Sequence, residues 1–193
     1  QQFLFHPSVS SSARTRTFLK IQDGCDYFCT YCAVPYARGR SRSDTTENTM
    51  RQVKEAVVSG TKEIVISGVN IGDFGRKNGE DLYGLLKEMC EIDGLERIRI
   101  SSIEPNLLET RILELAVEKN IVMPHFHIPL QAGTDKILKL MKRHYDTRFF
   151  ADKVNEVKRF MPDACIAVDL FTGFPGENDS DFMDTLSFIK SIP

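Results

Sequence analysis

The strand-like run Thr17-Phe18-Leu19-Lys20-Ile21-Gln22 leads into the segment Gly24-Cys25-Asp26-Tyr27-Phe28-Cys29-Thr30-Tyr31-Cys32. The first run has the length of a β-strand and is followed by turn residues. The second run carries three cysteines in the spacing C-x3-C-x2-C. A thiol-rich loop placed directly after a strand predicts a site for a metal or a metal cluster at the end of that strand.

Strand-like and helix-like segments alternate along the rest of the chain. Four further runs of about four to eight residues predict strands: Glu63–Ser67, Arg97–Ser101, His125–Leu130 and Cys165–Phe171. Helical spacing predicts six helices: a helix capped by Asp44 that stops at Gly60, then Leu82–Met89, Leu107–Lys119, Ile137–Met141, Phe149–Phe160 and Asp179–Ile192. Strands joined by crossover helices favour right-handed βαβ units. We therefore expect an α/β fold, an incomplete, open βα barrel with parallel strands and outer helices.

The barrel domain is expected over residues 17–193. Residues 1–16 lack periodicity, and Ser8–Ser12 has the composition of a linker, so we expect a flexible N-terminal segment there. The chain starts without Met, and Ile192-Pro193 falls about where another strand would begin. These features indicate an internal fragment of a longer protein, with the barrel truncated at its C-terminus.

The composition is that of an ordinary globular domain, with 41% hydrophobic residues. The formal net charge of −2 excludes a protein that coats DNA through a global positive field. The longest apolar run is about five residues, far short of the roughly 20 that span a membrane. Three of the five cysteines lie within eight residues, which favours metal binding in a reducing compartment over disulfides. We therefore expect a cytoplasmic protein with no membrane partner.

The three clustered cysteines admit three interpretations. Iron–sulfur clusters take Cys thiolates, ordinarily four for a [4Fe–4S] cube, so three ligands would leave one iron open for a substrate. A closed zinc site needs four ligands, and a His would have to complete it because the chain has no second cysteine pair. Buried, inert thiols are the third interpretation. The spacing favours the open [4Fe–4S] cluster, held by Cys25, Cys29 and Cys32.

Four further stretches resemble segments of a known enzyme family. They are residues 33–43 (AVPYARGRSRS), 99–105 (RISSIEP), 127–134 (HIPLQAGT) and 173–177 (GFPGE). Together with the C-x3-C-x2-C motif they resemble the methylthiotransferases among the radical S-adenosylmethionine enzymes. The second and third stretches are most similar to the branch that acts on N6-threonylcarbamoyladenosine in tRNA. Gln131-Ala132-Gly133-Thr134 departs from the family's more usual Gln-Ser-Gly-Ser but retains the Gln and the Gly.

The resemblance implies a radical reaction on the anticodon arm of a tRNA. Cys25, Cys29 and Cys32 would hold the cluster, and its open iron would bind S-adenosylmethionine. Reductive cleavage of this cofactor, with a donor such as flavodoxin or ferredoxin, would activate carbon 2 of the adenine next to the anticodon for methylthio transfer. Family members carry a preceding domain with a second, sulfur-donating [4Fe–4S] cluster and a C-terminal RNA-binding domain. We expect both domains to be absent from this chain.

Residues in the cluster loop and after the later strands are candidates for binding S-adenosylmethionine, because chemistry in a parallel barrel gathers at the C-terminal strand ends. They are Tyr31, Gly68, Asn70, Glu104, Gln131 and Gly173. Gly68 and Asn70 stand where many radical S-adenosylmethionine enzymes carry Gly-Gly-Glu. Only the glycine matches that motif, so an ordinary βα turn is the alternative. For Glu104 the alternative is a solvent-exposed carboxylate.

Basic side chains gather around the cysteine motif. Residues 14–42 hold six basic and two acidic side chains, a local net charge of +4. This charge suits RNA phosphates, so we expect the loop of Arg38, Arg40 and Arg42 to guide the anticodon arm. The alternatives are a solvated loop, or an arginine that pairs with a carboxylate and holds the cluster loop. A second basic group has the pattern of a solvated helix face: Lys136, Lys139, Lys142 and Arg143.

Alternation along two strands predicts which polar side chains face the barrel interior. His125 and His127 are expected to be structural, with a metal-binding pair as the alternative. Asp169 is expected to pair with an interior arginine such as Arg99, with a role in orienting ligands as the alternative. Three rival functions stay open at this stage. A related enzyme could act on isopentenyl-adenosine in tRNA or on an Asp of a ribosomal protein, and a non-catalytic, metal-binding RNA-binding module is the rival from another class.

Overall fold

Parallel strands form the centre of the molecule in the computed structural model, which describes residues 8–10 and 16–193. The main sheet has the order β1-β2-β5-β6. β2 (Arg16–Lys20), β5 (Glu63–Ser67) and β6 (Arg97–Ile100) are parallel to one another. β1 (Ser8–Ser10) runs antiparallel along the outer edge of β2.

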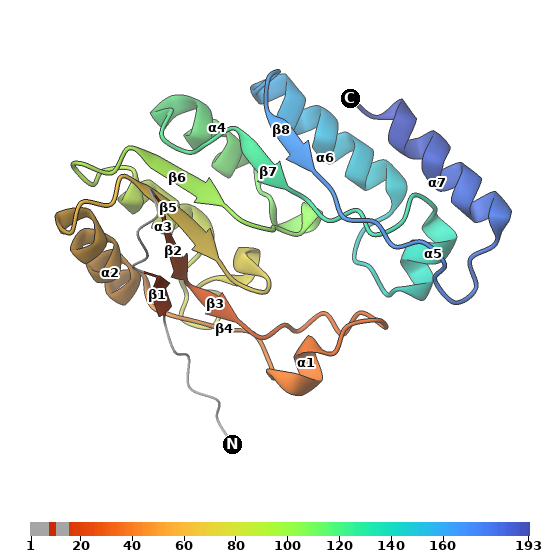
Figure 1. Cartoon of the computed structure of the whole chain (residues 1–193), viewed down its shortest axis with the longest axis horizontal. Helices are drawn as coiled ribbons and strands as arrows, with labels where there is room; N and C mark the ends of the chain where they lie inside the picture. Colours follow the sequence, from red (N-terminus) through yellow and green to blue (C-terminus); the bar gives the residue numbers. More distant parts are fainter. Residues whose placement is uncertain (1–7, 11–15) are drawn as a thin grey trace.

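A second parallel pair continues the curve of this sheet (Figure 1). β7 (His125–His127) pairs with β8 (Cys165–Ala167). A parallel bridge between Ser102 and His127 joins the end of β6 to β7, and a bridge between Gln131 and Leu170 extends the second pair. The parallel strands thus form an arch that does not close into a barrel within the described residues. The predicted open βα barrel is confirmed.

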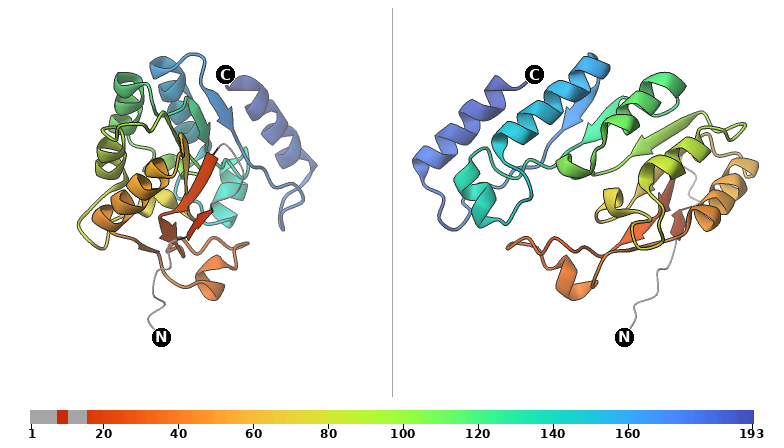
Figure 2. Two further views of the ribbon diagram at one scale, coloured as in Figure 1. Left: turned by 60° about the vertical axis from the view of Figure 1, so that its left-hand side comes forward. Right: turned by 180° about the vertical axis from the view of Figure 1, so that it is seen from behind.

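Helices cover the outer face of the arch. α2 (Thr46–Val58), α3 (Leu82–Met89), α4 (Thr110–Lys119) and α6 (Thr147–Phe160) lie in the crossovers between successive parallel strands. Seen from behind, α3, α4 and α6 lie across the strands (Figure 2). Phe126 of β7 is fully buried beneath them, and burial of such a side chain contributes roughly 1.5–3 kcal/mol to stability.

Shorter elements complete the fold. β3 (Gln22–Asp23) pairs antiparallel with β4 (Arg42–Ser43) beyond the end of β2. The remaining elements are the helix α1 (Val34–Ala37), the 3-10 turns η1 (Ile71–Asp73) and η2 (Pro105–Leu107), and the helices α5 (Asp135–Leu140) and α7 (Asp179–Ser191).

Several boundaries differ from the sequence predictions, among them the end of the last predicted strand, which stops at Ala167 and not at Phe171. Residues 8–10 form β1 within the predicted linker, because backbone pairing with β2 orders a segment whose own composition is that of a loop. The first strand ends at Lys20, and residues 22–23 turn away to pair with β4. β7 ends at His127, two residues before Pro129, which has no N–H for a strand ladder.

The start of α2 illustrates a one-residue correction. Thr45, and not Asp44, is the N-cap, and its side chain accepts a hydrogen bond from the Asn48 amide. Asp44 instead accepts hydrogen bonds from the side chains of Asn48 and Gln52 at 2.6 and 2.9 Å. Both residue types accept readily at helix starts, so the side chain that fits the N-cap geometry decides between them.

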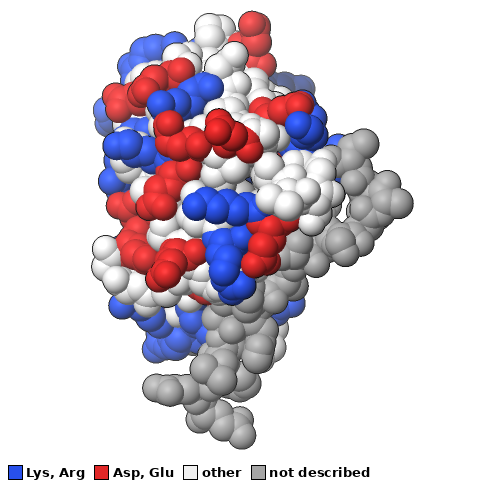
Figure 3. Space-filling view, turned by 90° about the vertical axis from the view of Figure 1, so that its left-hand side faces the viewer, with Lys and Arg blue, Asp and Glu red and all other residues white. Residues whose placement is uncertain are grey.

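No helix in the described part of the chain is long and apolar enough to cross a lipid bilayer. On the part of the surface that Figure 3 shows in colour, basic and acidic side chains are interspersed, with uncharged areas between them.

Candidate functional site

The thiol-rich loop leaves the sheet at the end of β3. The Cys25 amide donates to the Gly39 carbonyl (3.2 Å), and the Cys32 amide donates to the Cys29 carbonyl (3.0 Å). Phe28 has a φ of 52°, a left-handed conformation that non-glycine residues rarely adopt. The backbone therefore reverses sharply inside the motif. Cys29 is buried, while Cys25 and Cys32 are half-buried.

The donor chemistry of this loop fits a thiolate-bound cluster, because all three cysteines carry free thiols. Among the described residues, no three His, Cys, Asp or Glu side chains are grouped as metal ligands. The Cys25 sulfur accepts a hydrogen bond from the Tyr27 amide (3.4 Å), so it points back into its own loop. Burial, with the nearby Asp73 and Cys29, raises the pKa of the Cys25 thiol to about 11. A coordinated metal has the opposite effect, because it deprotonates the thiol.

A buried arginine that sequence reasoning missed lies against the loop. The Arg143 side chain is 3% exposed. Its guanidinium donates to the Cys29 sulfur at 3.2 Å and to the Tyr31 hydroxyl at 3.0 Å. It also pairs with the carboxylate of Glu104. The arrangement brings two predicted cofactor residues, Tyr31 and Glu104, next to a predicted cluster ligand.

The prediction of a solvated helix face is wrong for Arg143, because the helix ends before it. Lys142 has a φ of 58°, and the Arg143 amide donates to the Leu138 carbonyl at 2.9 Å. These are features of a left-handed helix stop, which glycine usually provides. With no glycine at this position, the sequence carries no signal that the chain turns inward.

The guanidinium of Arg143 stays positively charged because the Glu104 carboxylate lies beside it. Burial alone would lower the pKa of its guanidinium, but Glu104 raises it well above the ordinary value. Burial likewise raises the pKa of Tyr31, so its hydroxyl stays protonated. A permanent positive charge beside Cys29 stabilises negative charge in this part of the loop.

Two other predicted cofactor residues carry buried acceptors without a partner. Asn70 is 2% exposed and Gln131 is 8% exposed. Neither Asn70 Oδ1 nor Gln131 Oε1 has a hydrogen-bond partner among the described residues. Such an acceptor costs about 1–3 kcal/mol when it stays unsatisfied. Both positions therefore fit a ligand that donates N–H or O–H groups, as an ammonium group and ribose hydroxyls do.

The two predicted glycines differ in their surroundings. A Cβ at Gly68 would lie 2.9 Å from both the backbone and the side-chain oxygen of Gln22, so a larger residue would clash there. Gly173 has a φ of 74°, which favours glycine, but a Cβ there would meet nothing within 4 Å. Gly68 therefore has a packing role, and for Gly173 the structure shows a conformational reason only.

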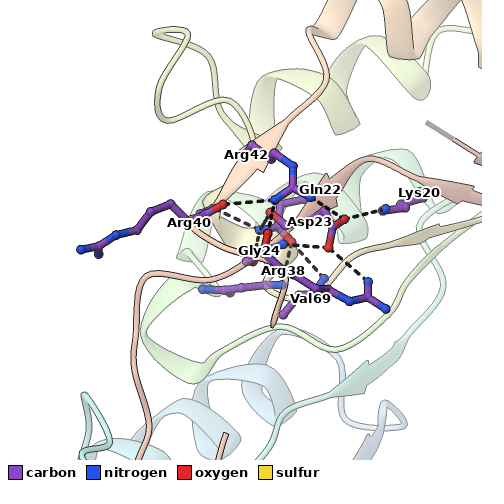
Figure 4. Close-up of polar contacts among 10 residues, drawn as sticks. Lys20, Gln22, Asp23, Gly24, Arg38, Arg40, Arg42 and Val69 are labelled. Carbon is purple, nitrogen blue, oxygen red and sulfur yellow. Dashed lines mark hydrogen bonds and ion pairs between the residues drawn. The ribbon is translucent and has the colours of Figure 1, made fainter. Parts of the chain in front are cut away.

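Gln22, which the sequence did not single out, joins the cluster loop to the loop after β5 (Figure 4). It is fully buried. Its side-chain nitrogen donates to the Gly24 carbonyl at 2.8 Å. Its side-chain oxygen accepts from the amides of Val69 and Asn70 at 2.9 and 2.8 Å. One amide group thus sets the distance between the cysteine motif and the predicted cofactor residue Asn70.

Asp23 binds two of the three arginines predicted to contact RNA (Figure 4). Arg38 lies 3.1 Å and Arg42 2.9 Å from its carboxylate oxygens, and Lys20 lies 2.8 Å away. Burial would raise the pKa of Asp23, but hydrogen bonds from Lys20, the Gly24 amide and Arg38 outweigh it and hold the pKa at about 2. The carboxylate-pairing alternative is therefore present in the geometry of Arg38 and Arg42.

Arg40 differs from its two neighbours. Its side chain is 67% exposed and approaches Asp26 only at 3.5 Å. Its guanidinium lies over the Phe28 ring, 4.7 Å from the centroid, and points away from Asp23 in Figure 4. Contact with RNA stays a prediction for all three arginines, and Arg40 has the most exposed side chain of the three.

The interior pairing predicted for Asp169 is wrong. His127 Nε2 lies 3.1 Å from Asp169, whereas Arg99 pairs with Glu63 at 3.2 Å. In the β5–β6 register, Glu63 is opposite Arg97. Arg99 is two residues further along β6, so its side chain lies on the same face of the sheet as that of Arg97. The carboxylate that pairs with Arg99 therefore comes from the neighbouring strand β5, and not from Asp169 as the sequence predicted.

Comparison with known proteins identifies the family of this site. The Radical SAM superfamily matches residues 19–189. The threonylcarbamoyladenosine tRNA methylthiotransferase MtaB of Bacillus subtilis is 42% identical over 183 residues, 92% of this chain and 40% of that protein. The tRNA-2-methylthio-N(6)-dimethylallyladenosine synthase of Clostridium perfringens is 38% identical over 186 residues, 95% of this chain and 42% of that protein. The chain thus spans less than half the length of these curated relatives.

Solved structures share the fold at low sequence identity. The radical S-adenosylmethionine methyltransferase TsrM from Kitasatospora setae has a TM-score of 0.74 at 15% identity, covering 90% of this chain and 34% of that chain. Coproporphyrinogen III oxidase HemN from Escherichia coli has a TM-score of 0.51 at 16% identity, covering 75% of this chain and 34% of that chain. The family match over nearly the whole chain confirms the resemblance drawn from the cysteine motif: the chain belongs to the radical SAM superfamily.

Proposed function

We propose that this chain is the catalytic barrel of a tRNA methylthiotransferase that modifies carbon 2 of N6-threonylcarbamoyladenosine next to the anticodon. The observation that carries the proposal is the C-x3-C-x2-C loop at the C-terminal edge of the parallel arch, packed against the buried Arg143. Relatives whose names give this activity are 42% and 41% identical to the chain. The activity, the tRNA substrate and the cytoplasmic location are proposals for the whole protein.

Cys25, Cys29 and Cys32 hold a [4Fe–4S] cluster in this proposal, and S-adenosylmethionine binds beside it. Membership of the superfamily implies both groups, and the bound cluster supplies the electron that cleaves the cofactor. Asn70 and Gln131 accept hydrogen bonds from the cofactor through their unpartnered buried oxygens. Arg143 holds Tyr31 and Glu104 in place, and it balances negative charge near Cys29.

Further components complete the proposal. The resemblance to the methylthiotransferases implies a second, sulfur-donating [4Fe–4S] cluster in a preceding domain of the whole protein, and the cysteines of this chain form only one such trio. A donor such as flavodoxin or ferredoxin supplies the electrons. The loop of Arg38, Arg40 and Arg42 borders the cysteine motif and faces the anticodon arm.

Nucleoside analysis tests this function. In cells that lack the full-length protein, mass spectrometry of anticodon-loop nucleosides should show N6-threonylcarbamoyladenosine without its 2-methylthio derivative. Restoring the wild-type gene should return the derivative, and restoring Cys29→Ala should not. An unchanged 2-methylthio level in the deletion strain would contradict the proposal.

The same experiment separates the nearest alternative. The Clostridium perfringens relative, 38% identical, is named for a dimethylallyladenosine substrate. Loss of the 2-methylthio form of that nucleoside alone would assign the protein to this second branch. Unchanged 2-methylthio nucleosides in tRNA, together with a missing methylthio group on a ribosomal-protein Asp, would assign the protein to the ribosomal-protein branch. A non-catalytic RNA-binding module would fail to cleave S-adenosylmethionine when reduced.

A further inference from the structure

A cavity of about 520 Å³ lies beside the cluster loop, and the function proposed above gives it no ligand. This volume is within the range of roughly 300–1,000 Å³ found for small-molecule sites. Its walls come from the cysteine motif, β4, the segment after η1, η2 and the α5–α6 connection. None of the residues predicted to bind S-adenosylmethionine lines it. The cavity is therefore adjacent to the candidate cofactor site but separate from it.

One wall of the cavity is a stack of two rings. Tyr27 and His144 are parallel within 5°, with centroids 4.0 Å apart. Asn106 holds the Tyr27 ring in place by donating a hydrogen bond to the Tyr27 hydroxyl at 2.7 Å. Because His144 is exposed, a flat ligand can extend the stack on its ring.

A second wall offers an acceptor without a partner. Asn106 uses its nitrogen on Tyr27, while its Oδ1 is buried and accepts no hydrogen bond among the described residues. Nucleobase edges carry the amino and ring N–H donors that such an oxygen binds. An amide beside an aromatic stack is thus suited to the edge and the face of one base.

The third wall is cationic. The side chains of Arg76 and Lys77 are 65% and 59% exposed. Arg76 contacts Asp73 through one nitrogen at 2.9 Å, and this contact raises the pKa of its guanidinium. Lys77 donates to the Ser41 carbonyl at 2.6 Å and lies 3.9 Å from the carboxylate of Asp26, which also lines the cavity. Both cations therefore keep donors for a phosphate group at the open side of the cavity.

We propose that this cavity binds one ribonucleotide of the tRNA strand next to the target base. The base stacks on the exposed ring of His144, which Tyr27 supports from its other face, its edge meets Asn106, and its phosphate contacts Arg76 and Lys77. This inference rests on the proposed function. Tyr27 lies between Cys25 and Cys29 in the motif, so a nucleotide on this stack is held next to the reaction centre.

The physical need for such a site follows from the reaction. An enzyme that modifies carbon 2 of a base must take that base out of the strand, and its neighbour then loses a stacking partner. Aromatic side chains replace lost stacking in single-stranded RNA and accept every base, because each base has a flat face. The cavity therefore contributes affinity with little dependence on the identity of the neighbouring base.

Binding of a fluorescent anticodon stem-loop RNA to the full-length protein tests the inference, measured by anisotropy at several salt concentrations. His144→Ala should weaken binding by roughly 5-fold or more, as expected for the loss of one stacked base. Lys77→Ala should lower the slope of log affinity against log salt by about 0.7, the value for one contact to a single strand. Lys77→Arg should restore the slope. Arg148→Ala is the matched control, because this 90% exposed arginine of α6 does not line the cavity.

Two further measurements on the same variants locate any effect. Iron content and affinity for S-adenosylmethionine should equal those of the wild type. If His144→Ala and Lys77→Ala bind the RNA as tightly as the wild type, the inference is overturned while the proposed function stands. If they lose affinity for S-adenosylmethionine and keep it for RNA, the cavity belongs to the cofactor, which also overturns it. Wild-type protein that does not bind the RNA at all would overturn the proposed function itself.

Discussion

The two edges of the parallel sheet both carry buried charge, but they assemble it in different ways. At the N-terminal edge, Glu63 of β5 pairs with Arg97 and Arg99 of the next strand at 3.1 and 3.2 Å. At the C-terminal edge, Arg143 reaches Glu104 from a loop 39 residues further along the chain. The first set follows from strand register. The second exists only because loops far apart in sequence meet.

The C-terminal edge also carries strained backbone and unsatisfied acceptors in the cysteine motif and at predicted cofactor residues. Phe28 and Gln131 have positive φ angles without being glycine, and Asn70 and Gln131 keep unpartnered buried acceptors. Strain and unsatisfied polar groups persist only where the surrounding structure holds them, and they concentrate at functional sites. The comparison predicts that changes at the C-terminal edge affect ligand binding, whereas changes at the N-terminal edge affect stability alone.

The largest effect is expected for Cys29→Ala. Anaerobic reconstitution of the wild type should give about four irons per chain and a broad visible absorption, and the variant should lose both. Cys90→Ala is the control, since this half-buried thiol lies at the C-cap of α3, and burial raises its pKa to about 11. Stoichiometric zinc that survives purification, with no uptake of iron, would contradict the cluster assignment.

Arg143→Met should lower the free energy of unfolding by about 3–5 kcal/mol, because it leaves Glu104 buried without its partner. Urea denaturation of the iron-free protein measures this change. The double variant Arg143→Met/Glu104→Gln should recover part of the loss, since no uncompensated charge is then buried. A loss below about 1 kcal/mol in the single variant would mean that the ion pair does not organise this edge.

Glu63→Gln tests the other edge and should cost about 1.5–3 kcal/mol at neutral pH, the range for a hydrogen bond to a charged group. Burial would raise the pKa of Glu63, but Arg99 and Arg97 lower it below its ordinary value of 4.5. The stabilisation by this charge is therefore complete above pH 4.5 and is lost as the pH falls through the lower folded-state pKa. Urea denaturation at several pH values should show the difference between wild type and variant shrinking in that acidic window. Iron content should not change.

The smallest effect on stability is expected for Arg40→Ala, within about 1 kcal/mol, because its pair with Asp26 is exposed. In the full-length protein the same variant should lower the salt slope of tRNA binding by about 0.7–0.9. Arg42→Ala provides the comparison, since it removes a partner of Asp23 and should cost more stability. An Arg40→Ala variant with an unchanged salt slope would remove Arg40 from the predicted RNA surface.

The strands, the helices and the cysteine motif were predictable, because each depends on residues that are close together in the sequence. Ile64, Ile66 and Ile98 belong to short apolar strands, and Met50 and Val53 keep helical spacing, so the order of strands and helices could be read directly. The C-x3-C-x2-C motif needs only eight residues, and its place after the first strand identified the edge that carries the site.

Features that depend on distant partners were not predictable. The contact between Arg143 and Cys29 spans 114 residues, and that between Gln22 and Asn70 spans 48. β3 and β4 are two residues each and form only because they pair with each other. Neither Gln22 nor Arg143 carries a local signal, because a polar side chain looks the same in sequence whether it is solvated or buried.

The sequence by itself determined the alternating α/β order, the cysteine motif and the family, because periodicity and short spacing are local properties of a chain. The tertiary structure alone decided which charges are paired. It showed that Asp23 holds Arg38 and Arg42, that Glu63 takes Arg99, and that Arg143 lies inside the site. The physical reason is that the strength of an ion pair depends on distance and burial, and both are set only when the loops of the arch come together.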